Sequence, residues 1–269
     1  AVWAGGGESP GDASETYDGA SWTEGNNLNT ARYFGTGTGT ATAGLVMGGR
    51  HPTPTRLALS EEYNGTSWAE GNDLPAALDA SSGCGIQTAA LNIGGNLGPP
   101  GDANTANIYD GSSWSDTGDN INTERYQGGA IGTTTAALFV GGYRKATSGT
   151  ATLCESYDGS SWTEVGDIPT ASQTGAMSGT QASAMFYGGS PPGTQHYTWD
   201  ESSWTTNTVL STGRINLGGT PSGTTATAMA YGGGDGPTEN ETEEWNFSST
   251  LAAGAWATGG NLNDGQDFL

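Results

Sequence analysis

The fold is decided by one stretch of the sequence, residues 136–164, which reads AALFVGGYRKATSGTATLCESYDGSSWTE. It opens with an apolar run that a glycine pair closes, Gly141-Gly142, and it ends with Tyr157, an Asp-Gly pair and Trp162. An apolar run without polar alternation predicts a strand that is buried on both faces. Asp-Gly between two strands predicts a tight hairpin, because glycine accepts the positive φ that the turn requires.

The same order of features recurs along the whole chain. The glycine pairs lie 43 to 47 residues apart, which is a period typical of propeller blades. These pairs are Gly5-Gly6, Gly48-Gly49, Gly94-Gly95, Gly141-Gly142, Gly188-Gly189 and Gly232-Gly233. Each is followed by two aromatic residues around a turn, namely Tyr17 and Trp22, Tyr63 and Trp68, Tyr109 and Trp114, Tyr157 and Trp162, Trp199 and Trp204, Trp245 and Trp256. Each unit therefore predicts one sheet of four short strands.

Six such units predict an all-β protein, a single six-bladed β-propeller that covers residues 1–269. The predicted blades are 1–24 with 265–269, 32–70, 79–116, 125–164, 173–205 and 214–257. The chain opens at the second strand of a blade, and residues 265–269 align with the start of a first strand. We therefore expect the N- and C-terminal strands to pair and close the ring, which leaves no sheet edge unpaired at the seam.

The order of an arginine before the first strand, an apolar run, Gly-Gly, Tyr and Trp resembles the kelch repeat. The resemblance covers essentially the whole chain and implies four-stranded, kelch-like blades. The stretch at 158–164, DGSSWTE, is also similar to repeats in virion proteins of tailed phages. That similarity implies a component of a virion or another extracellular surface, such as a phage tail, a fibre or a capsid-decorating protein.

Charge narrows the possible partners. Seven Lys and Arg residues stand against 28 Asp and Glu residues, so the formal net charge is -21. Such an acidic protein repels phosphate backbones and anionic head groups, which argues against nucleic acid as a partner. No apolar run approaches the roughly 18 residues that a membrane-spanning helix needs, so we expect no membrane insertion. Cys84 and Cys154 fall at different positions of different repeats, and nothing requires them to form a disulfide.

The basic residues predict a recognition surface on one face of the ring. Loops that vary on a rigid scaffold are where binding usually resides, and the links from the second to the third strand vary most between copies. The candidate ligand-binding residues at the starts of first strands are Arg32, Arg125 and Arg214, and those in the links are Arg50, Arg56, Tyr143, Arg144 and Lys145. Both histidines, His51 and His196, are expected in the same class of link.

Two interpretations of the arginine trio at positions 32, 125 and 214 remain open. Spaced at alternate blades, the three guanidinium groups could line a central opening and bind carboxylate or sulfate groups in a forked geometry. The kelch resemblance implies instead that each arginine bonds to neighbouring backbone.

No catalytic residue, metal site or cofactor is expected. The two histidines and two cysteines are scattered over the repeats, which argues against a zinc site and against a serine triad. The alternative is a carbohydrate-active enzyme such as a sialidase-like glycosidase, in which three arginines could hold a sugar carboxylate. We therefore predict a noncatalytic binding or structural propeller that recognises a glycan or a protein, either on a host surface or on neighbouring virion subunits.

Overall fold

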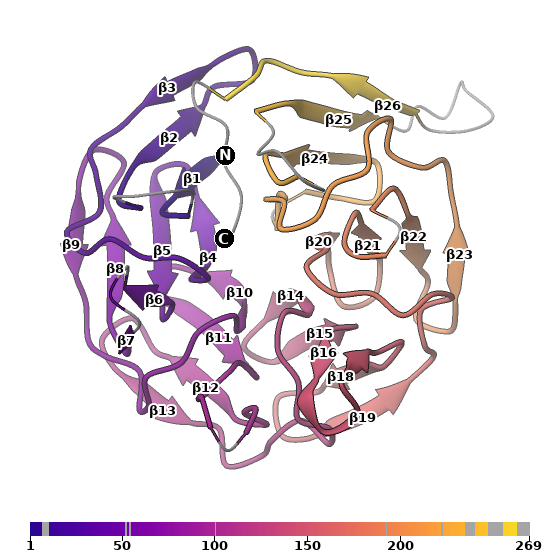
Figure 1. Cartoon of the computed structure of the whole chain (residues 1–269), viewed down its shortest axis with the longest axis horizontal. Helices are drawn as coiled ribbons and strands as arrows, with labels where there is room; N and C mark the ends of the chain where they lie inside the picture. The colour runs from indigo at the N-terminus through magenta and orange to yellow at the C-terminus, as the bar shows by residue number, and fades with distance from the viewer. Residues whose placement is uncertain are drawn as a thin grey trace.

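The computed structural model describes residues 1–262 apart from 7–10, 52, 54, 100, 192, 222, 235–239 and 247–254. Within these residues the chain forms six antiparallel sheets that are arranged as blades around a central axis (Figure 1). The predicted fold class, an all-β six-bladed propeller, is confirmed.

Four of the blades contain four described strands each. Blade 2 contains β4 (Thr36–Thr40), β5 (Ala43–Met47), β8 (Ser60–Tyr63) and β9 (Trp68–Glu70). Blade 3 contains β10 (Ser82–Ile86), β11 (Ala89–Ile93), β12 (Ala106–Tyr109) and β13 (Trp114–Asp116). Blade 4 contains β14 (Gly129–Thr133), β15 (Ala136–Val140), β18 (Cys154–Tyr157) and β19 (Trp162–Val165). Blade 5 contains β20 (Ala176–Gly179), β21 (Ala184–Tyr187), β22 (His196–Trp199) and β23 (Trp204–Thr206).

The two blades at the seam are described in part. Blade 1 contains β1 (Val2–Ala4), β2 (Ser14–Tyr17) and β3 (Trp22–Glu24). Blade 6 contains β24 (Thr227–Tyr231), β25 (Thr242–Asn246) and β26 (Ala255–Thr258). A β-bridge between Gly218 and Tyr231 adds an inner position to blade 6. The predicted inner strand of blade 1, residues 265–269, lies outside the described residues.

Each blade follows from its repeat. The apolar run of blade 4 becomes β15, and four of its five residues are buried. The turn after β18 is closed by Asp158, whose Oδ1 accepts hydrogen bonds from the backbone N–H groups of Ser160 at 2.9 Å and Ser161 at 2.8 Å. Gly159 takes a φ of 95° in this turn, which a side chain would disfavour. The repeated Asp-Gly pair thus builds the outer hairpin of the blade.

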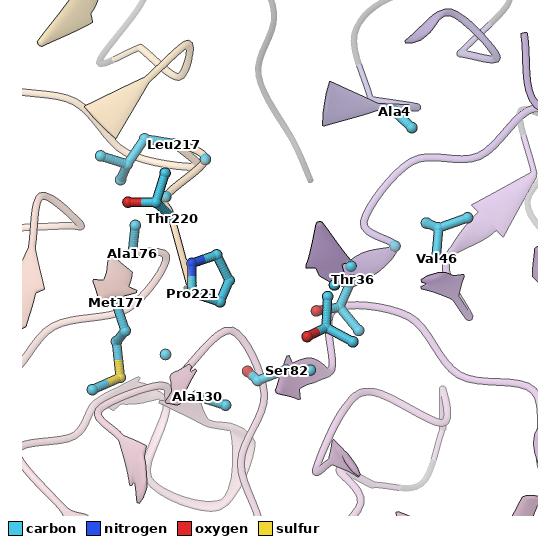
Figure 2. Close-up of a pocket in the computed structure, with 18 of the residues that line it drawn as sticks. Ala4, Thr36, Val46, Ser82, Ala130, Ala176, Met177, Leu217, Thr220 and Pro221 are labelled. Atoms are coloured by element: carbon cyan, nitrogen blue, oxygen red, sulfur yellow. The ribbon is translucent and has the colours of Figure 1, made fainter. Parts of the chain in front are cut away.

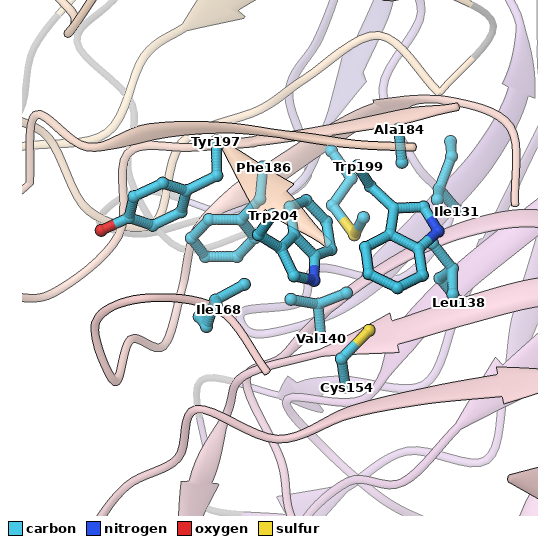
Figure 3. Close-up of a cluster of buried hydrophobic side chains, with 11 residues drawn as sticks. Ile131, Leu138, Val140, Cys154, Ile168, Ala184, Phe186, Tyr197, Trp199 and Trp204 are labelled. Atoms are coloured by element: carbon cyan, nitrogen blue, oxygen red, sulfur yellow. The ribbon is translucent and has the colours of Figure 1, made fainter. Parts of the chain in front are cut away.

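Tryptophans join neighbouring blades. The indole Nε1 of Trp68 in blade 2 donates to Ser14 Oγ of blade 1 at 3.3 Å. Across the seam, Trp22 Nε1 of blade 1 donates to Thr242 Oγ1 of blade 6 at 3.1 Å, which is the equivalent contact. Figure 3 shows the interface of blades 4 and 5, where Val140 and Cys154 pack with aromatic side chains that include Trp204. The contact across the seam between blades 6 and 1 therefore has the same form as the contact between blades 1 and 2.

Helical structure is nearly absent from the described residues. The one helical turn among them is η1 (Lys145–Thr147), so none of them forms a helix long enough to cross a bilayer.

Candidate functional site

The arginine trio lies inside the blades. Arg32 is 1% exposed, and Arg125 and Arg214 are fully buried. Arg32 Nη2 forms an ion pair with Glu61 Oε1 at 2.7 Å, and its Nη1 donates to the backbone oxygens of Gly48 and Leu59 at 2.9 and 3.0 Å. The carboxylate of Glu61 also accepts the backbone N–H of Asn29 at 2.7 Å. The guanidinium of Arg32 and the carboxylate of Glu61 therefore find their partners within the protein.

The other two arginines repeat this arrangement. Arg125 pairs with Glu155 and donates to the backbone oxygen of Gly141 at 2.8 Å. Arg214 pairs with Glu243 at 2.9 Å and donates to the Gly232 oxygen at 3.2 Å. The interpretation that this trio lines a central opening is wrong, because the side chains are buried and already paired. The contacts to neighbouring backbone that the kelch resemblance implied are present, and the glutamate partners were not predicted from the sequence.

A signal for these partners exists in the sequence. In the three blades that contain the arginines, a glutamate stands two positions before the first aromatic residue, as Glu155 does before Tyr157. In blade 3, where Leu78 takes the place of the arginine, Asn107 takes the place of the glutamate. Arginine and glutamate thus occur together or are replaced together in these blades.

Two small ribbons carry the remaining cations. In blade 2 the link forms β6 (Arg50–His51) and β7 (Thr55–Arg56), and in blade 4 it forms β16 (Tyr143–Arg144) and β17 (Gly149–Thr150). Arg50 lies directly opposite Arg56 in the register of the first ribbon. Like charges in directly opposed positions destabilise a ribbon.

Both ribbons reach blade 3, which lies between them. Arg50 Nε lies 3.7 Å from Asp79 Oδ2, and Arg56 Nε lies 3.4 Å from Asp79 Oδ1. From the other side, Lys145 Nζ lies 3.6 Å from Asp102 Oδ1. We call Arg50, Arg56 and Lys145 the cationic cluster.

One residue of blade 3 links the two halves of the cationic cluster. The backbone oxygen of Asn96 accepts a hydrogen bond from Arg56 Nε at 2.8 Å, and its side-chain Oδ1 accepts one from Lys145 Nζ at 3.1 Å. Residues from blades 2, 3 and 4 therefore meet at one place. The repeat pattern places these cations in one class of link, and the structure brings three of them together.

The cations of the cluster are accessible, whereas their acidic partners are not. The side chains of Arg50, Arg56 and Lys145 are 37%, 21% and 41% exposed, but those of Asp79 and Asp102 are 4% and 1% exposed. Burial raises the pKa of Asp79, and the nearby arginines oppose that rise only in part. Three cations face two buried carboxylates, so the cluster presents excess positive charge to solvent.

Aromatic rings flank the cationic cluster. The guanidinium carbon of Arg50 lies 5.5 Å from the ring centroid of Phe34, and Lys145 Nζ lies 6.0 Å from that of Tyr126. Tyr143 packs against Tyr126 with a centroid distance of 5.4 Å. The Nε of Arg144 is buried and has no hydrogen-bond partner among the described residues. The site thus combines exposed positive charge with aromatic surface.

A cavity of about 270 Å³ occupies the centre of the ring (Figure 2). Small, hydroxyl and apolar residues line it, among them Thr36, Ser82, Ala130, Met177 and Thr220. None of the described lining side chains carries a formal charge, and the arginine trio is not among them. The described side chains around the central opening are therefore uncharged.

The two histidines do not share a setting. His51 lies in a ribbon, where its Nδ1 is 2.8 Å from Thr53 Oγ1. His196 is the first residue of β22 and is fully buried, with its ring 4.6 Å from that of Trp245. The expectation that His196 lies in a link is wrong, because the third strand begins earlier than the turn residues indicated. Burial lowers the pKa of His196 to about 4.

Both cysteines are free and buried. Burial raises the pKa of Cys84 and that of Cys154 to about 12, so both thiols are protonated near neutral pH. No group of three or more His, Cys, Asp or Glu side chains arranged to hold a metal ion occurs within the described part of the chain.

Comparisons with known proteins bear on the fold. No protein-family model matches the chain, and no curated protein matches it in sequence. Solved structures do match, and one of them is the structure of YjhT. It superposes with a TM-score of 0.74 at 14% sequence identity, over 91% of this chain and 91% of that one. This likeness shows the fold alone, and the chain is a six-bladed β-propeller.

Proposed function

We propose that this protein is a noncatalytic recognition propeller that binds an acidic glycan through the cationic cluster. One observation carries the proposal, namely the distribution of positive charge. All seven Lys and Arg residues are described, and three of them are consumed in buried ion pairs. Three of the other four form the cationic cluster, so a chain of net charge -21 gathers most of its accessible Lys and Arg side chains at one place.

The geometry of the cluster favours a carboxylate as the anionic group. Arg50 and Arg56 stand side by side despite their mutual repulsion, and they share the single buried carboxylate of Asp79 at distances longer than good hydrogen bonds. A ligand carboxylate between them can accept shorter, forked bonds and relieve that repulsion.

The aromatic rings favour a sugar over an acidic protein surface. Phe34, Tyr126 and Tyr143 lie within reach of the same cations. Rings of this kind offer flat apolar faces next to polar groups, which suits a ligand that is hydroxylated on its edge and apolar on its face. The proposed setting, a virion or another extracellular surface, rests on the resemblance of the stretch at 158–164 to repeats in virion proteins of tailed phages and on the strongly acidic composition.

A glycan array tests the proposal. Wild-type protein is expected to bind uronic-acid oligosaccharides, and a variant with Arg50→Gln, Arg56→Gln and Lys145→Gln is expected to lose that binding. Unchanged binding by the variant would contradict the role of the cluster. Binding restricted to acidic peptides would assign the cluster to a protein partner, and release of free sugar from the probes would favour an enzyme.

A further inference from the structure

Five residues at equivalent places in successive blades adopt a left-handed backbone. We call them the collar, and their φ angles lie between 52° and 59°. The collar consists of Phe34, Ala80, Gln127, Thr174 and Asn216. None is glycine, although a residue with a side chain loses roughly 1–2 kcal/mol in this conformation. Among the described residues, 24 glycines take a positive φ elsewhere, so this chain places glycine freely where the backbone needs it.

Backbone hydrogen bonds explain the conformation of the collar but not its side chains. The N–H of each of the last four collar residues donates to the oxygen of the collar residue in the preceding blade. The first two such bonds, Ala80 to Phe34 and Gln127 to Ala80, measure 2.7 and 2.8 Å. The next two, Thr174 to Gln127 and Asn216 to Thr174, measure 2.7 and 3.0 Å. Glycine could form the same bonds without strain, so the side chains require a separate reason.

The collar side chains belong to the central cavity. All five residues line the cavity of about 270 Å³ shown in Figure 2. Thr174 Oγ1 donates to the backbone oxygen of Gln173 at 2.6 Å, which leaves its lone pairs available. The side-chain amides of Gln127 and Asn216 form no hydrogen bond with the rest of the described chain. The collar thus offers uncharged donors and acceptors, which match sugar hydroxyl groups.

The collar adjoins the cationic cluster. Phe34 belongs to the collar and carries the guanidinium of Arg50 over its ring. Tyr126, the ring beneath Lys145, immediately precedes Gln127 in the chain. A ligand whose acidic group is bound by the cluster therefore has its neighbouring atoms at the mouth of the cavity.

We propose that the collar forms the second half of the glycan site and binds the hydroxyl groups of a uronic-acid oligosaccharide. This inference rests on the proposed function and adds its specificity-determining part. Gln127, Thr174 and Asn216 are the residues that contact the sugar ring. Their side chains are retained at strained positions because glycine would stabilise the ring but remove the ligand contacts.

Glycine substitutions separate the two roles. Gln127→Gly and Thr174→Gly are each expected to raise the melting temperature by about 1–3 °C, because the relief of strain exceeds the added conformational entropy of glycine, whereas Asn216→Gly should change it little because asparagine tolerates the left-handed region. Each is also expected to weaken the binding of trigalacturonic acid by about three- to tenfold, which is the loss of one or two neutral hydrogen bonds. Ala80→Gly is the matched control, since it relieves the same strain but removes only a methyl group. It should raise the melting temperature and leave the affinity unchanged.

A second probe distinguishes the collar from the cationic cluster. The methyl ester of trigalacturonic acid keeps the ring hydroxyls and lacks the charge, so collar variants should weaken binding of the acid and the ester alike. Arg56→Gln should weaken binding of the acid alone. Glycine variants that bind both probes like wild type, while Arg56→Gln still weakens acid binding, would overturn the collar proposal and leave the proposed function standing. A wild-type protein that binds neither probe would overturn both.

Discussion

The sequence allowed Arg32, Arg125 and Arg214 to be ligand-binding residues, but in the structure they form buried ion pairs inside the blades. Arg125 shows why, because its guanidinium pairs with Glu155 and bonds to backbone oxygens at the start of the blade. A buried ion pair adds little net stability over a well-packed neutral pair, but removing one partner leaves an uncompensated charge. The accessible arginines, Arg50 and Arg56, have the opposite property, since their contacts are long and open to solvent.

Single and double substitutions test the buried ion pair of Arg125 and Glu155. Arg125→Leu alone should lower the free energy of unfolding by about 3–5 kcal/mol, because Glu155 remains buried and unpaired. Adding Glu155→Asn recreates the pair Leu78 and Asn107 that blade 3 already contains, and it should recover a large part of the loss. Urea unfolding monitored by tryptophan fluorescence measures both. A double variant less stable than either single variant would contradict this account.

His196 makes the free energy of unfolding depend on pH. Its pKa is lowered to about 4 by burial, whereas an unperturbed histidine titrates near 6.5. The unfolded chain therefore binds a proton at a higher pH than the folded one, so stability falls as the pH drops from about 6.5 to about 4. The loss amounts to about 3 kcal/mol.

Substitution of His196 isolates its share of the pH dependence. His196→Thr places the residue found at the equivalent position of blade 6, Thr242, and should flatten the pH profile of the unfolding free energy between pH 6.5 and 4. His51→Thr, in the ribbon of blade 2, is the matched control for replacing one histidine by threonine. Equal slopes in all three proteins would show that His196 does not contribute.

At the scale of the element, an indole-to-hydroxyl hydrogen bond joins the blades at two interfaces, whereas the Nε1 atoms of Trp114 and Trp162 are buried without a partner among the described residues. Trp68 Nε1 donates to Ser14 and Trp22 Nε1 donates to Thr242. At the corresponding place between blades 3 and 4 the residue is Ala106, and Trp162 Nε1 is buried without a partner among the described residues. A buried donor without an acceptor lowers stability.

A hydroxyl group at position 106 should fill this gap. Ala106→Ser is expected to raise the free energy of unfolding by about 1 kcal/mol, because it provides an acceptor for Trp162 Nε1 as Ser14 does for Trp68. The same substitution in a Trp162→Phe background lacks the donor and should give no gain. Chemical denaturation of the four proteins as a double-mutant cycle measures the coupling, and a gain that persists without the indole would contradict the assignment.

At the scale of the whole molecule, the sequence was sufficient for the architecture and insufficient for half of the site. Gly-Gly pairs and Asp-Gly turns recur at one spacing, so the six blades could be predicted from local rules. Whether Arg32 points into a blade or into the central opening depends on Glu61, which is 29 residues away and becomes adjacent only when the sheet forms. The left-handed backbone of the collar could not be predicted from the sequence, because Gln127 and Thr174 are not residue types that favour a positive φ.

The cationic cluster could be predicted from the sequence only in part. Its members could be assigned to one class of link from the repeat alignment. Their contacts with Asp79 and Asn96 depend on how the two ribbons pack against blade 3. The repeat alignment does not specify this packing. The resulting molecule is an acidic ring in which three accessible cations meet beside a central cavity lined by uncharged side chains.

The most direct test of this account is a calorimetric titration of trigalacturonic acid into wild type, Arg56→Gln and Asn64→Asp. The last variant matches the change in net charge and keeps its turn, because Asp110 already forms that turn in blade 3. Arg56→Gln is expected to weaken binding at least about tenfold, the worth of one charge-assisted hydrogen bond, and Asn64→Asp is expected to bind like wild type. Equal affinities for all three proteins would contradict it.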